Sequence, residues 1–180
     1  MSMSWMRNKY SVLVMVTVAS VVIDQVSKSL VIASFPKGGN LPIIPGFFEI
    51  YHAHNYASAF GLFSGNHALF FVGVSLLAIC LLGFYFLRLR RDDLWVATAL
   101  AMILAGALGN NVFDRLRHGF VVDFIRFYLG SWSWPTFNFA DISIVCGVAL
   151  FAIDMIRTER QARAEQRAAA KEDAGVPRSA

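Results

Sequence analysis

Long apolar runs alternate along the chain with short polar connections. Residues 68–87 and 94–113 are each twenty residues long and contain no Asp, Glu, Lys or Arg. Two further apolar windows, residues 10–35 and 137–156, carry a few embedded charges. A helix of about 20 residues is long enough to cross a hydrocarbon core of roughly 30 Å. The pattern therefore predicts four membrane-spanning helices.

The composition agrees with a membrane protein. Of the 180 residues, 57% are hydrophobic and 16% are charged, whereas soluble domains average about 25% charged residues. The net charge is +4, but six of the sixteen Lys and Arg residues lie beyond residue 156. Such a distribution is typical of a membrane orientation signal and not of a phosphate-binding surface. We therefore expect no nucleic-acid partner.

The basic residues also predict how the chain is oriented. Eleven of them precede the first span, separate the second span from the third, or follow the fourth. Cytoplasmic connections are the ones enriched in Lys and Arg, so both termini are expected in the cytoplasm. Residues 1–156 would form the membrane domain and residues 157–180 a polar tail, compatible with a continued helix. The connections at residues 34–67 and 114–136 are then expected on the outer side of the membrane.

In this topology, the unusual polar residues of the spans gather near the outer face. A charge inside the membrane costs on the order of 2.5 to 3.5 kcal/mol, so several together indicate a site. The polar residues expected there are Asp24 and Lys28 of the first span, Asn110, Asn111, Asp114 and Arg115 of the third, Asn138 and Asp141 of the fourth, and Asp123 of the outer connection.

Asp123 and Asp141 are the best candidates for chemistry. An ionised carboxylate can take a proton from water while a protonated partner donates one to the substrate, and proximity separates their two pKa values. Cysteine chemistry is disfavoured because Cys80 and Cys146 both lie inside spans, and no serine lies in a GxSxG motif. The HxH sequence at residues 52–54 has no third ligand nearby, so we expect no metal.

Four segments, in this order, resemble the motifs of the bacterial lipoprotein signal peptidases, the signal peptidase II family. They are DQVSK at 24–28, NYASAFG at 55–61, FDRLRHGFVVDF at 113–124 and FNFAD at 137–141. The resemblance implies an aspartyl endopeptidase of the bacterial inner membrane. Its substrates would be prolipoproteins carrying a diacylglyceryl cysteine, cut just before that cysteine, with Asp123 and Asp141 as the catalytic pair.

The sequence departs from the family pattern at two places. The family's G-N-x-x-D-R reads GNNVFDR here, with one extra residue, so either Asn110 or Asn111 could match the family asparagine. We favour Asn111, because residues three apart, such as Asn111 and Asp114, share one face of an α-helix. The second departure is Ala57, which stands where the family often has Gly; we expect only a modest backbone adjustment there.

The remaining site residues have structural as well as functional interpretations. Asp24 and Lys28 are four apart and favour an ion pair that braces the site. Asp114 and Arg115 are interpreted as a supporting network that holds Asn111 or the outer loop. Two asparagines could either cap turns and helices or contact the substrate backbone, and these are Asn55 and Asn138.

The expected fold is an all-α membrane protein. It is a four-transmembrane-helix bundle with a small extracytoplasmic β-rich platform at residues 41–55 and a short interfacial helix around residues 124–129. Substrate would enter sideways from the membrane lipids, and a monomer without a cofactor is expected. The alternative function is a small proton-coupled carrier or channel component, in which the embedded Asp and Lys residues relay protons.

Overall fold

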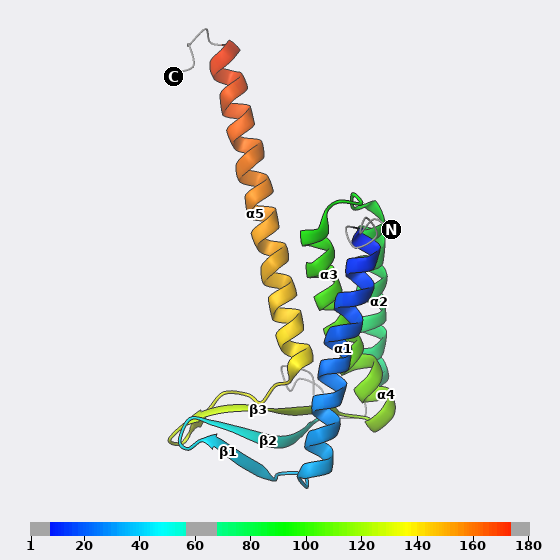
Figure 1. Cartoon of the computed structure of the whole chain (residues 1–180), viewed down its shortest axis with the longest axis vertical. Helices are drawn as coiled ribbons and strands as arrows, with labels where there is room; N and C mark the ends of the chain where they lie inside the picture. Colours follow the sequence, from blue (N-terminus) through cyan, green and yellow to red (C-terminus); the bar gives the residue numbers. More distant parts are fainter. Residues whose placement is uncertain (1–7, 57–67, 174–180) are drawn as a thin grey trace, which may run out of the picture.

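The computed structural model describes residues 8–56 and 68–173. Its helices run alongside one another, and a small sheet lies across one end of them (Figure 1). The elements in chain order are α1 (Lys9–Ser34), β1 (Asn40–Ile44), β2 (Phe48–Asn55), α2 (Ala68–Arg88), α3 (Leu94–Ala107), the π-helix η2 (Leu108–Asp114), α4 (Arg115–His118), β3 (Val121–Leu129), β4 (Trp132–Ser133) and α5 (Phe139–Asp173).

Three helical segments of the described chain are long and apolar enough to cross a membrane. They are Lys9–Ser34, the continuous segment Leu94–His118 and Phe139–Ala170. The second expected span is the 21-residue helix α2, whose part Leu76–Arg88 is also apolar. The structure is therefore a mostly helical membrane protein.

Helix α3 is the central helix. In the apolar window of the segment Leu94–His118, which begins with α3, 56% of the residues are buried, against 6% in the window of α1 and 17% in that of α5. Small residues allow close helix contact in a membrane, and α3 and α5 use them in this way. A Cβ atom on Gly147 would lie 2.7 Å from the carbonyl oxygen of Ala99, and one on Gly106 would collide with Ile144 and the backbone of Ala140. This contact fixes the start of α5 against the end of α3.

The sheet is antiparallel, with the strand order β1-β2-β3-β4. Residues 41–55, expected as a β-rich platform, form most of the hairpin β1-β2. The prediction of a short helix around residues 124–129 is wrong, because these residues belong to β3. Strand β3 pairs with β2 from Phe48↔Phe127 to Asn55↔Val121. The β-branched and aromatic residues of this segment suit a strand. The predicted all-α fold is therefore corrected to a mostly helical fold with a four-stranded sheet.

Lys9 has a structural role that its place among the N-terminal basic residues did not reveal. It is buried, and its Nζ donates to the carbonyl oxygens of Phe86 at 2.7 Å and Leu89 at 2.7 Å. The last carbonyls of a helix have no partner within that helix, and a cation there is favourable. Lys9 thus ties the start of α1 to the end of α2.

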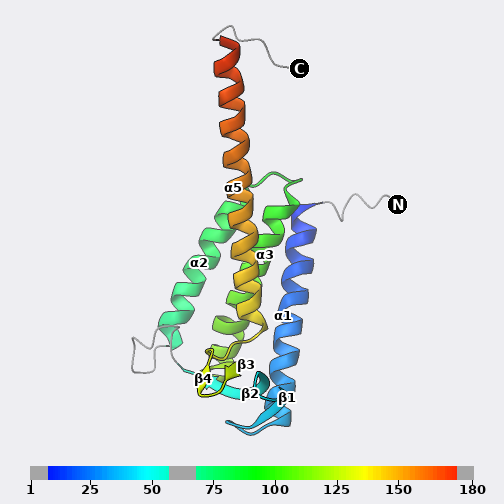
Figure 2. The same ribbon diagram turned by 90° about the vertical axis from the view of Figure 1, so that its left-hand side faces the viewer.

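Helix α5 projects far beyond the other helices at the end opposite the sheet (Figure 2). The polar tail after residue 156, which the sequence left compatible with a continued helix, is helical as far as Asp173. From residue 157 to residue 170 every side chain is exposed. The sheet and this projecting segment therefore lie at opposite ends of the molecule.

Candidate active site

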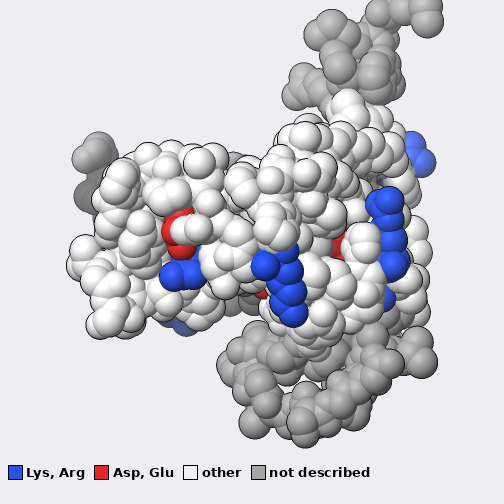
Figure 3. All heavy atoms as spheres, turned by 90° about the horizontal axis from the view of Figure 1, so that it is seen from below, with Lys and Arg blue, Asp and Glu red and all other residues white. Residues whose placement is uncertain are grey.

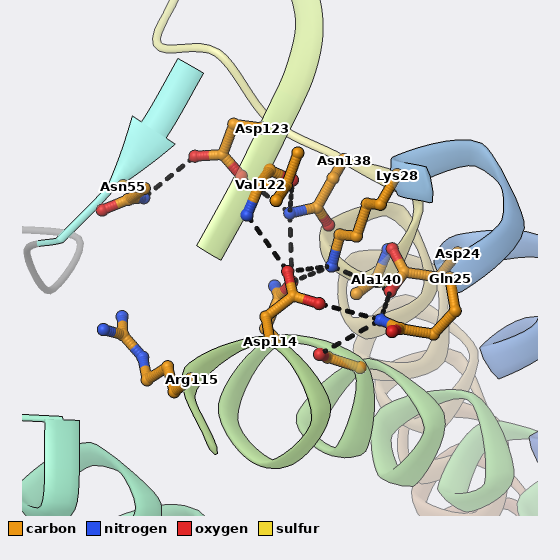
Figure 4. Close-up of polar contacts among 12 residues, drawn as sticks. Asp24, Gln25, Lys28, Asn55, Asp114, Arg115, Val122, Asp123, Asn138 and Ala140 are labelled. Atoms are coloured by element: carbon orange, nitrogen blue, oxygen red, sulfur yellow. Dashed lines mark hydrogen bonds and ion pairs between the residues drawn. The ribbon is translucent and has the colours of Figure 1, made fainter. Parts of the chain in front are cut away.

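The polar residues singled out in the sequence converge at the sheet end of the helices (Figure 4). They come from the second half of α1, from η2, from the facing ends of β2 and β3, and from the start of α5. Seen from this end, the surface is mostly uncharged, with isolated acidic and basic groups (Figure 3). The cluster lies largely beneath that surface, because Asp24, Lys28, Asp114, Asp123 and Asn138 are each at most 3% exposed.

Asp123 lies on β3 with both carboxylate oxygens hydrogen-bonded. Its Oδ1 accepts from Nδ2 of Asn138 at 2.7 Å, and its Oδ2 accepts from Nδ2 of Asn55 at 3.0 Å. Burial raises the pKa of Asp123 from 3.8 to about 7, and the nearby charge of Asp141 also raises it, whereas the two amide hydrogen bonds lower it. Near neutral pH, Asp123 can therefore both hold and release a proton.

Asp141 lies in the first turn of α5 and also accepts hydrogen bonds on both oxygens. Asn138 and Asp141 cap the helix reciprocally: the Asn138 amide donates to Oδ2 of Asp141 at 3.1 Å, and the Asp141 amide donates to Oδ1 of Asn138 at 3.0 Å. Nδ2 of Asn110 donates to Oδ1 of Asp141 at 2.8 Å. Acceptor contacts and a helix N-terminus both favour a carboxylate. Asn138 is thus bonded to both Asp141 and Asp123.

Lys28 lies at the centre of the supporting network. The expected ion pair with Asp24 is confirmed, with 2.8 Å between Nζ and Oδ2. Nζ also lies 2.9 Å from Oδ2 of Asp114 and 2.7 Å from Oδ1 of Asn110. An ammonium has three hydrogens to donate, so all are used. Because Lys28 binds the amide oxygen of Asn110, the amide nitrogen of Asn110 is turned toward Asp141.

The two carboxylates paired with Lys28 each hold a backbone amide beside a candidate catalytic residue. Oδ1 of Asp24 accepts from the amide of Ala140 at 2.9 Å, next to Asp141 in the chain. Oδ2 of Asp114 accepts from the amide of Val122 at 3.0 Å, next to Asp123. The Lys28 bridge therefore sets where the backbones of both candidate residues lie, which is a positioning role.

Gln25 joins the same two carboxylates, although sequence reasoning gave it no role. Its Nε2 donates to Oδ2 of Asp24 at 3.0 Å and to Oδ1 of Asp114 at 2.9 Å. Its position in the sequence could have indicated this role. Gln25 follows Asp24 in the first apolar span, and a side-chain amide inside such a span needs a polar partner. Gln25 adds a second bridge between α1 and η2.

The structure places Asn110, and not Asn111, against the aspartates. The choice of Asn111 assumed an α-helix, but Leu108–Asp114 is a π-helix, which takes up one extra residue per turn. Asn110 and Asp114, which are four apart, both reach Lys28. The Asn111 side chain accepts instead from Nε of Arg115 at 3.2 Å. The preference for Asn111 as the asparagine beside the aspartates is therefore wrong, because it assumed α-helical geometry.

Arg115 lies on the Asn55 side of the site, away from the Lys28 cluster (Figure 4). It is 7% exposed and follows η2 directly. Arg115 donates to Asn111, and Asp114 accepts from the amide of Val122 in the outer connection and pairs with Lys28. The two residues thus make the contacts expected of a supporting network, through separate partners. The departure at Ala57 lies outside the described residues.

The two histidines of the HxH sequence have partners within the sheet region. Nε2 of His54 lies 3.1 Å from Nε2 of His52, and Nδ1 of His52 lies 2.8 Å from the carbonyl oxygen of Phe35. The His54 ring also stacks on Phe120, with 3.8 Å between centroids. These contacts link β2 to the end of α1 and to the segment before β3.

The fold and the site define a mostly helical membrane protein with two adjacent carboxylates suited to acid–base chemistry at one end of its helices. A family model described as signal peptidase (SPase) II matches residues 16–157. The chain is 40% identical to the lipoprotein signal peptidase of Geobacter metallireducens over 158 residues, or 87% of this chain and 97% of that one. It is 40% identical to that of Xanthomonas campestris pv. campestris over 155 residues, or 82% and 92%.

Solved structures agree with these relatives. One bacterial membrane enzyme matches with a TM-score of 0.73 and 32% identity, covering 81% of this chain and 87% of that chain. A second matches with a TM-score of 0.72 and 32% identity, covering 79% and 91%. The chain belongs to the signal peptidase II family of lipoprotein signal peptidases, which cleave the signal peptides of lipoproteins.

Proposed function

We propose that this chain is an aspartic endopeptidase that hydrolyses diacylglyceryl-modified prolipoproteins just before the lipidated cysteine, with Asp123 and Asp141 as the catalytic pair. The observation that carries the proposal is the shared contact with Asn138, whose side chain binds Asp123 and whose backbone amide binds Asp141. One buried residue thus binds both carboxylates at the start of a helix. Family membership supplies the substrate class.

The surroundings of the two aspartates support different roles for them. Asp141 has two acceptor contacts and a helix N-terminus, which suit the carboxylate that takes a proton from the attacking water. Asp123, whose pKa is raised to about 7 mainly by burial, suits the protonated partner. Its proton would go first to the carbonyl oxygen of the scissile bond, and the departing amine would then be protonated by the pair. Water is the nucleophile, so the reaction uses no cofactor.

The proposal includes a topology. The four apolar helices would all span the membrane, with the sheet at the outer face of the inner membrane and both termini in the cytoplasm. The distribution of basic residues supports this orientation. Substrate and its acyl chains would approach sideways through the lipids, and the enzyme would act as a monomer.

The carrier alternative receives less support from the structure. A relay needs ionisable groups through the depth of the membrane. The described polar network is confined to the sheet end, and Lys9 at the other end is bound to the end of α2. Family membership also favours the peptidase.

The test is cleavage of a purified diacylglyceryl prolipoprotein by the wild type, by Asp123→Asn and by Asp141→Asn, each in detergent. Asparagine keeps the shape of the side chain and removes its acid–base capacity. We expect both variants to lose cleavage while their thermal unfolding remains cooperative. Cleavage that survives in either folded variant would contradict the aspartic mechanism, whereas its loss in both supports the pair.

A further inference from the structure

The projecting end of α5 carries a segregated charge pattern that the site does not use. Four arginines, Arg157, Arg160, Arg163 and Arg167, lie on this segment, and all four are exposed. At about 100° of rotation per residue, they fall within roughly 120° of the helix circumference. The two acidic residues of the same segment, Glu159 and Glu165, lie outside that sector. We call the arginine side the basic face.

The first arginine marks where the segment leaves the membrane. Its guanidinium lies over the Trp95 ring, 5.2 Å from the centroid. Trp95 is 42% exposed, and its Nε1 donates to the carbonyl oxygen of Leu150 at 3.1 Å. Tryptophan is enriched at the level of the lipid headgroups. The basic face therefore begins at Arg157, at the headgroup level, and continues away from the apolar part of α5.

The composition of the segment limits what it can bind. Besides the charged residues, positions 158–170 contain only Ala, Gln and Thr. No large apolar side chain is present to insert among acyl chains or to form the seam of a coiled coil. Recognition must then rest on charge, and a partner would present closely spaced negative groups. The nearest such groups are the phosphates of the membrane in which α5 is embedded.

We propose that the basic face of α5 docks on anionic phospholipid headgroups next to the point where the helix leaves the membrane. An upright helix rises 1.5 Å per residue and would carry Arg167 about 15 Å from the level of Arg157. That is farther than a Debye length of about 8 to 10 Å. Docking therefore requires the segment after Arg157 to tilt toward the surface. Every side chain at 158–170 is exposed, so side-chain packing does not oppose this tilt. Because α5 is one continuous helix from Phe139 to Asp173, docking requires the helix to bend just after Arg157.

The experiment uses the full chain in lipid nanodiscs. A fluorophore is attached to a cysteine at Ala169→Cys, with Cys80→Ser and Cys146→Ser in the background, and is quenched by nitroxide-headgroup lipids. Discs of phosphatidylcholine alone are compared with discs that also contain phosphatidylglycerol. We expect quenching to rise with phosphatidylglycerol and to disappear at about 1 M salt, where the Debye length is about 3 Å.

Two variants distinguish the basic face from net charge. The triple change R160Q/R163Q/R167Q should lower the docking constant about fivefold per arginine, or on the order of 100-fold in total. The matched change E159Q/E165Q removes the two acidic groups outside the arginine sector, including the Glu159 carboxylate that pairs with Arg163, and should leave docking intact or strengthen it. Arg157 is left unchanged because it packs on Trp95.

Three outcomes would overturn the proposal. They are equal quenching in both kinds of disc, equal quenching in the triple arginine variant, and a response to added RNA without one to phosphatidylglycerol. Hydrogen exchange of the unsubstituted chain gives a second measurement that needs no cysteine changes. Its amides at 158–170 should exchange more slowly in the anionic discs, and unchanged exchange would also count against docking.

Discussion

The hydrogen bond between Asn55 and Asp123 allows a test of which group acts as the acid. If protonated Asp123 is required, kcat/KM should fall as pH rises through its pKa of about 7. For a pKa of about 7 the protonated fraction is about 91% at pH 6 and about 9% at pH 8, so the ratio of wild-type kcat/KM between these pH values should be about ten. The upper pKa belongs to the coupled pair and appears as the basic limb of the profile.

Asn55→Ala should move that limb to higher pH. The amide of Asn55 donates to Oδ2 of Asp123 at 3.0 Å and lowers the pKa of that carboxyl. A hydrogen bond to a charged group contributes about 1.5 to 3 kcal/mol, and one pKa unit is 1.36 kcal/mol, so we expect a rise of about one unit. The ratio of kcat/KM between pH 6 and pH 8 should then shrink to about two.

The assay is the cleavage rate of a diacylglyceryl prolipoprotein in detergent at low substrate concentration, measured across this pH range. Asn40→Ala is the matched control, because Nδ2 of Asn40 also donates to a carboxylate, that of Glu49 at 2.7 Å. The basic limb of the kcat/KM profile of Asn40→Ala should lie at the same pH as that of the wild type. A limb that stays in place in Asn55→Ala, or moves to lower pH, would refute the role of Asp123 as the acid, whatever happens to the absolute rate.

Three further substitutions test the supporting network. Lys28→Met removes the cation between two buried carboxylates and should destabilise the fold by about 3 to 5 kcal/mol, measured as a lower midpoint of thermal unfolding; an unchanged midpoint would contradict the network. Asn110→Ala should lower kcat on the order of 100-fold, because it removes the hydrogen bond that holds Asp141, the proposed base. Asn111→Ala should have little effect on kcat. A larger loss in Asn111→Ala than in Asn110→Ala would instead support the α-helical interpretation. A Cβ atom on Gly109 would lie 2.6 Å from Oδ2 of Asp24, so Gly109→Ala should lower the free energy of unfolding by about 1 to 3 kcal/mol. Gly83→Ala is the control, because a Cβ atom there meets nothing within 4 Å, and it should not lower the midpoint of thermal unfolding.

The sequence predicted which polar residues gather at one end of the helices, because charged groups in apolar spans are costly and therefore conspicuous. Asp24 and Lys28 stand out in the first apolar window, and their four-residue spacing was sufficient to predict their ion pair. Asp123 and Asp141 were linked by chemistry and by the resemblance to a family. What joins them in space is Asn138, whose contacts depend on the start of α5 meeting β3.

The elements that the sequence misjudged depend on partners that lie far away in the chain. Residues 121–129 form a strand because β2, more than sixty residues earlier, offers its edge. Lys9 is buried because the last carbonyls of α2 need donors. A local pattern identifies neither partner, since it records periodicity and not which surfaces meet.

The π-helix shows how one additional residue can leave a site intact. Gly109 must lie against Asp24, and Asp114 must face Lys28, so both ends of the segment are fixed by contacts with α1. An extra residue in an α-helix would turn one of these ends away by about 100°. The wider turn of η2 absorbs that residue between them, which leaves Asn110 directed at Asp141 and places Asn111 outside the network. The contacts with α1 thus select the helix type, and local propensity does not.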